Sequence, residues 1–68
     1  DMRIKSDMLV LDIVEQYPQT DSVFREYDEI IGECLLCNCL FESVGSVAKE
    51  YQLDEAEMLR KLNEAVRK

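Results

Sequence analysis

The residues of this 68-residue chain whose types and spacing could do chemistry are its three cysteines. All three lie in the segment GECLLCNCLF, residues 32 to 41. Cys34 and Cys37 have the C-x-x-C spacing, at which two sulfur atoms can bond across one helical turn. The leading hypothesis is a redox pair that switches between dithiol and disulfide, with Cys39 as a resolving or third thiol.

Some residues beside this pair favour thiol reactivity, and others oppose it. Reactive pairs usually have a thiol pKa that a helix N-terminus or a nearby cation lowers. Gly32 favours a helix start just before the pair. Asp28, Glu29 and Glu33 are acidic, however, and negative neighbours disfavour the thiolate.

Two other interpretations of the cysteines stay open. Free cysteine is among the most buried residue types, so CLLCNCLF could be the centre of a small core, in a structural domain that binds other proteins. Alternatively Cys34, Cys37 and Cys39 could bind zinc or an iron–sulfur cluster, which typically take four ligands. The fourth ligand would then be a carboxylate, a second chain or an exogenous group, because the chain has no histidine.

The sequence offers no complete catalytic constellation. No histidine is present to act as a general base or to activate a cysteine nucleophile. A glycine-rich phosphate loop is also lacking. Enzymatic activity is therefore uncertain, and would be at most thiol–disulfide chemistry without a bound cofactor.

The charge balance limits the classes of binding partner that the chain could have. Fifteen carboxylates oppose eight cations, for a net charge of −7. Nucleic acids need a basic face, and an acidic membrane surface would repel this chain, so neither is expected as a partner. No apolar run approaches the length needed to span a bilayer. Three cysteines do not form a closed disulfide framework, which favours a reducing cytoplasm.

Helical periodicity predicts four main helices and an all-α domain over residues 1–68. The apolar stripes of the four segments are Val10, Ile13, Val14 and Tyr17; Val23, Phe24, Tyr27, Ile30 and Ile31; Val44, Val47, Ala48 and Tyr51; and Met58, Leu59, Leu62, Ala65 and Val66. Pro18 ends the first helix, since the residue before a proline disfavours helical geometry. Thr20, Ser43 and Asp54 are predicted N-caps of the other three.

Between the second and third main helices, Gly32 is a predicted C-cap, and a short helical turn follows that carries the cysteines. The N-terminal residues MRIK could be extended or disordered. No segment alternates with the period of a strand, and no hairpin turn signal occurs.

Three ordered features of the chain resemble one protein family. These are DML…DIVEQYPQTDSVFREY, then the C-x-x-C, then FESVGSVAKEYQLDEAEMLRKLNEA. Together they resemble a small bacterial helical domain of unknown function that is described as the hybrid-cluster-protein-associated redox disulfide domain. The matching positions, over roughly residues 4 to 65, are Pro18, Val23, Phe24, Cys34, Cys37, Phe41, Glu42, Asp54, Leu59, Leu62 and Asn63.

The resemblance implies a helical domain with a redox-active Cys34–Cys37 pair. It also implies a protein partner or a further domain of a parent chain, whereas a homodimer belongs to the structural interaction domain. The chain departs from the family pattern at the site itself. Cys39 is an additional thiol, and DEIIGE, with Gly32, stands where the family has a Gly-Met turn.

Overall fold

A computed structural model of the chain describes residues 2–67, so residues 1 and 68 of the predicted domain lie outside it. The elements are α1 (Val10–Gln16), a 3₁₀ turn η1 (Pro18–Thr20), α2 (Asp21–Ile31), α3 (Leu35–Asn38), α4 (Val44–Glu50) and α5 (Glu55–Arg67). Among the described residues there is no strand, only an isolated bridge between Leu9 and Ser43. The all-α prediction is confirmed: α1, α2, α4 and α5 are the main helices, and α3 is the cysteine-bearing turn.

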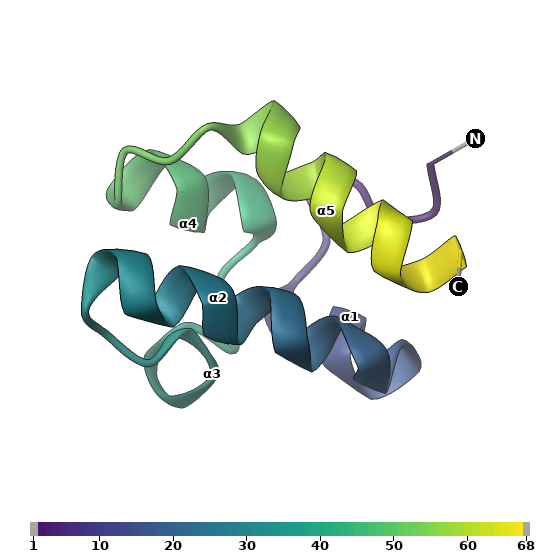
Figure 1. Ribbon diagram of the computed structural model, residues 1–68, viewed down its shortest axis with the longest axis horizontal. Helices are drawn as coiled ribbons and strands as arrows, with labels where there is room; N and C mark the ends of the chain where they lie inside the picture. Colours follow the sequence, from purple (N-terminus) through teal and green to yellow (C-terminus); the bar gives the residue numbers. More distant parts are fainter. Residues whose placement is uncertain (1, 68) are drawn as a thin grey trace.

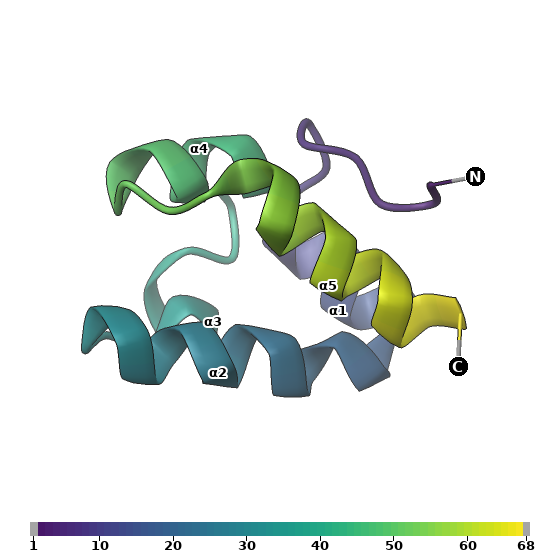
Figure 2. The same cartoon turned by 45° about the horizontal axis from the view of Figure 1, so that its top comes forward.

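The helices enclose one core. In Figure 1, α4 and α5 lie above α2, while α3 lies below the end of α2 and α1 behind its beginning. Figure 2 shows that α5 crosses α2 diagonally. The largest fully buried side chains are Phe24, Ile4, Ile13, Leu35, Met58, Leu62, Val10, Val44, Val47, Thr20 and Cys39. Each of the five α-helices, or the residue next to it, therefore contributes to this core.

Two of the predicted N-caps are confirmed. The Ser43 hydroxyl accepts a hydrogen bond from the Ser46 N–H at 3.1 Å, at the start of α4. A carboxylate oxygen of Asp54 accepts from the Glu57 N–H at 3.1 Å, at the start of α5. These bonds satisfy amides that have no partner within the helix.

The predicted cap at Thr20 is wrong. Thr20 is fully buried, and its hydroxyl donates to the Tyr17 carbonyl at 2.7 Å instead of accepting from α2. The reason is that η1 runs directly into α2 with helical backbone at Thr20, so α2 has no separate N-terminus there.

The predicted burial of Ile30 is also wrong, because 64% of the residue is exposed. Val23, Phe24 and Tyr27 of the same stripe are buried as predicted. α5 crosses α2 at an angle (Figure 2), and in the last turn of α2 Ile31 packs against the core while Ile30 faces solvent.

The N-terminal segment is held by one buried side chain of α5. The Ile4 N–H donates to Asn63 Oδ1 at 2.9 Å, and Asn63 Nδ2 donates to the Ile4 carbonyl at 3.0 Å. Asn63 Nδ2 also donates to the Leu59 carbonyl at 2.9 Å. Asn63 therefore substitutes for a neighbouring strand, and it fixes the segment that carries Ile4 into the core.

Gly32 ends α2 as predicted, with a left-handed backbone (φ 75°) and its N–H donating to the Asp28 carbonyl at 2.8 Å. We expect Gly32→Ala to destabilise the protein by about 1–2 kcal/mol, because a Cβ strains this conformation. Urea denaturation would measure the loss, and Gly32→Asn should cost less because asparagine tolerates this region better. An unchanged midpoint for Gly32→Ala would contradict the assignment.

Candidate thiol–disulfide site

Cys34 and Cys37 are joined by a disulfide bond, with their Cα atoms 5.2 Å apart. Cys34 is the residue before α3 and is half-buried, whereas Cys37 lies within α3 and is exposed. Cys39 follows α3 as a free thiol and is only 2% exposed. Two of the three candidate residues are thus brought together at the surface, and the third lies in the core.

Two interactions position α3. Leu35, between the bonded cysteines, is fully buried and anchors the turn in the core. Its N–H donates to a carboxylate oxygen of Asp28 in α2 at 2.8 Å. Asp28 therefore occupies an amide of the first turn of α3, and the disulfide is held at a fixed place beside the end of α2.

The buried thiol contacts an aromatic hydroxyl that the sequence interpretation had assigned only to an apolar stripe. Cys39 Sγ lies 3.9 Å from the Tyr51 hydroxyl, which donates to Glu33 Oε1 at 3.3 Å. Either the thiol or the hydroxyl can be the donor in the contact between Cys39 and Tyr51. This chain of contacts connects the end of α4 to the residue before Cys34.

The surroundings of Cys39 keep it protonated. Burial raises the pKa of the Cys39 thiol above its ordinary value, although the bond with Tyr51 acts in the opposite direction. The contact with Cys39, followed by desolvation, raises the pKa of the Tyr51 hydroxyl. Since the thiolate is the reactive form of cysteine, Cys39 is poorly suited to exchange while the protein is folded.

An open groove of about 270 Å³ borders the disulfide. It is lined by Asp28, Glu29, Gly32, Glu33 and Cys34. The sequence places no lysine or arginine between Arg25 and Lys49. The lining that Cys34 shares in this groove is therefore acidic.

The cysteine segment is half core and half surface. Leu35 and Cys39 are buried, Leu36 and Leu40 are partly buried against the core, and Phe41 is 79% exposed. The core interpretation thus describes only part of CLLCNCLF. The remainder presents a disulfide and an exposed aromatic ring to solvent.

Glu50, the last residue of α4 and the neighbour of Tyr51, is expected to make the thermal stability of the fold depend on pH. A hydrogen bond with Glu42 and then the charge of Glu42 raise the pKa of Glu50 above its ordinary value of 4.5. A raised carboxyl pKa stabilises the fold below the unfolded-state value, and this contribution is lost as pH rises through the folded-state value. Glu50→Gln should therefore have a higher Tm than the parent chain at pH 7, and the difference should vanish below about pH 4.5.

Thermal melts from pH 3 to pH 8 would measure this difference, with Glu15→Gln as a charge-matched control on the exposed face of α1. An equal stabilisation by both variants at pH 7 would show that only net charge matters.

The metal interpretation has no geometric support within residues 2–67, where no group of three or more histidine, cysteine or acidic side chains is placed to hold a metal ion. Cys34 and Cys37 are bonded to each other, and Cys39 instead contacts Tyr51.

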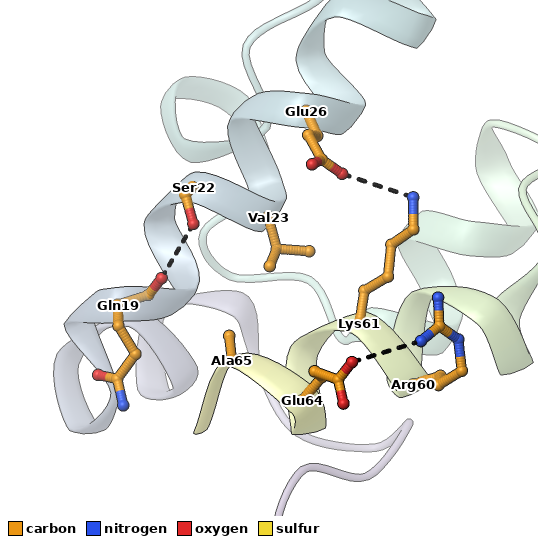
Figure 3. A pocket seen from close by; sticks show the side chains of 8 residues that line it. All are labelled: Gln19, Ser22, Val23, Glu26, Arg60, Lys61, Glu64 and Ala65. Atoms are coloured by element: carbon orange, nitrogen blue, oxygen red, sulfur yellow. Dashed lines mark hydrogen bonds and ion pairs between the residues drawn. The ribbon is translucent and has the colours of Figure 1, made fainter. Parts of the chain in front are cut away.

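A larger groove of about 500 Å³ lies between the first turns of α2 and the second half of α5 (Figure 3). Its cations are already paired: Lys61 lies 3.4 Å from Glu26, and Arg60 is bound to Glu57 and Glu64. The disulfide lies after the other end of α2, at Cys34 and Cys37. This groove therefore offers no free charge for a ligand and belongs to the packing of the two helices.

No helix within residues 2–67 is both long and apolar enough to cross a membrane. Comparisons of the chain with protein-family models, with curated proteins and with solved structures each returned no match.

Proposed function

We propose that this chain is a small redox module in which Cys34 and Cys37 alternate between disulfide and dithiol in exchange with a protein partner. The observation that supports it best is the Cys34–Cys37 disulfide, in which Cys37 is exposed to solvent. The turn that carries it is held in place by the buried Leu35. The resemblance to the redox disulfide family supports the same role. The proposed location is the cytoplasm, where a dithiol partner would be kept reduced.

The reaction is two successive exchanges. A thiolate of the partner attacks Cys37 Sγ, because Cys37 is the more exposed of the pair, and Cys34 leaves as a thiolate that takes up a proton. The partner's second thiolate then attacks the partner's first sulfur in the mixed disulfide. Cys37 is released as a thiolate. The partner loses two electrons as its disulfide forms, and Cys34 and Cys37 gain them. The reverse sequence oxidises the module.

The test is a titration of the folded protein in buffers of defined thiol–disulfide ratio, with alkylated thiols counted by intact mass. We expect a two-electron transition that Cys34→Ser and Cys37→Ser each abolish and Cys39→Ser preserves. Circular dichroism would establish that all three variants are folded. A transition that survives Cys34→Ser, or one that needs Cys39, would contradict the proposal.

A second candidate is a structural interaction domain that pairs as a homodimer. The exposure of Ile30 and Phe41 favours it, since large apolar side chains at the surface often lie at interfaces. Sedimentation at several protein concentrations would detect a dimer. A dimer whose dissociation constant Ile30→Glu or Phe41→Glu raises, together with a disulfide that no buffer reduces, would favour this candidate over the redox module.

A further inference from the structure

We propose that the exchange partner is a protein segment with positive charge next to its reacting thiols, and that Glu29 and Glu33 select it. This inference rests on the proposed redox function and adds the chemical class of the partner.

The first observation is the uncompensated charge beside the disulfide. Asp28, Glu29 and Glu33 line the groove that Cys34 borders. Five ion pairs occur among the described residues, and they join Asp21, Glu26, Glu57 and Glu64 to arginine or lysine. Glu29 and Glu33 take part in none of these pairs, and both are exposed. Arg25 lines a groove with Glu29 but is bound to Asp21, and Glu33 accepts only the neutral Tyr51 hydroxyl. Within residues 2–67, no cation therefore contacts either carboxylate directly.

The second observation is the chemistry of the bond itself. The attacking group in thiol–disulfide exchange is a thiolate, so negative charge must approach the sulfur atoms. Glu29 and Glu33 lie on the Cys34 side of the bond, and their negative charge repels the thiolate through space. Each further negative charge on the attacking molecule adds to that repulsion. Cations beside the partner's thiol reverse the sign of the interaction and also favour its thiolate. Glutathione, whose net charge is negative, is accordingly a disfavoured reductant of this bond.

Apolar side chains exposed along the cysteine segment favour a protein segment over a small cationic thiol as the partner. Phe41 is 79% exposed four positions after Cys37, and Leu36 and Leu40 are only partly covered. A peptide chain that places a thiol at Cys37 also has side chains that can reach these neighbours, whereas a small thiol has none. The occupant that fits both charge and surface is thus a basic segment that carries a pair of thiols.

The experiment compares two dithiol peptides of equal length, with the same C-x-x-C centre, one flanked by lysines and the other by glutamates. Stopped-flow rates of reduction of the intact protein are divided by the rates of the same peptides with a capped, neutral Cys-Leu-Leu-Cys disulfide. This division removes the difference in intrinsic thiol reactivity. We expect the lysine peptide to be favoured by roughly ten-fold or more at low ionic strength. At about 1 M salt the preference should largely disappear, since charges are then screened within a few ångströms.

The double variant Glu29→Gln/Glu33→Gln should lose most of this preference, and glutamine at position 33 keeps an acceptor for Tyr51. Asp28 stays unchanged because it caps α3. The control Asp12→Asn/Glu15→Gln changes net charge by the same amount on exposed residues of α1 and should keep the preference. Equal relative rates for both peptides would overturn the inference and leave the redox function standing. A disulfide that neither peptide reduces would overturn both.

Discussion

Leu35→Ala is expected to lower the free energy of unfolding by about 2–5 kcal/mol, the range for truncating a buried leucine. Leu35 is fully buried, and it is the side chain that holds α3 and both bonded cysteines against the core. For a domain of this size the whole stability is roughly 3–10 kcal/mol, so the loss is large. Urea denaturation of the oxidised protein would measure it as a lower midpoint with an unchanged slope.

The matched control is Leu36→Ala, because Leu36 is the next residue of α3 and is only partly buried. It should cost about 1 kcal/mol. If Leu35→Ala fails to fold, Leu35→Met keeps most of the volume and should cost less than about 1.5 kcal/mol. Equal losses for the two alanine variants would mean that Leu35 is not the anchor of the site.

Asn63→Ala is expected to cost about 2–6 kcal/mol, because it leaves the buried N–H and C=O of Ile4 without partners at about 1–3 kcal/mol each. Hydrogen exchange should show the effect locally, since the Ile4 amide is protected only by Asn63. We expect this amide to exchange rapidly in the variant while the amides of α2 stay protected.

Asn38→Ala, at an exposed asparagine, is the control and should change stability by less than about 0.5 kcal/mol. An Ile4 amide that remains protected in Asn63→Ala would show that another group holds the N-terminal segment.

The helix ends were predictable wherever one residue has a single strong local preference. Pro18, Gly32, Ser43 and Asp54 each mark an end where the structure has one. The failure at Thr20 arose because a hydroxyl can cap a helix or bond to an earlier carbonyl, and local sequence does not decide between these. The exposure of Ile30 depends on which side of the last turn of α2 the rest of the chain covers, and the sequence of α2 alone does not encode this.

At the site, the C-x-x-C spacing was enough to pair Cys34 with Cys37, because contacts across one turn are local. The partners of Leu35 and Cys39 are seven and twelve residues away, at Asp28 and Tyr51. Asp28 looked like one more acid near the thiols, and Tyr51 looked like one more apolar side chain. Their roles follow from how α2, α3 and α4 pack together, so they required the three-dimensional structure.

The bond between Ile4 and Asn63 has a topological consequence. It ties together positions 59 residues apart in sequence, and both ends of the described chain emerge on one side of the molecule (Figure 1). A short glycine-rich linker could therefore join these ends, and new ends could be opened at the exposed Gln52, where the backbone already turns outside any helix. The same geometry makes the domain suitable for insertion into a surface loop of a host protein. The inserted domain would bring the Cys34–Cys37 disulfide with it.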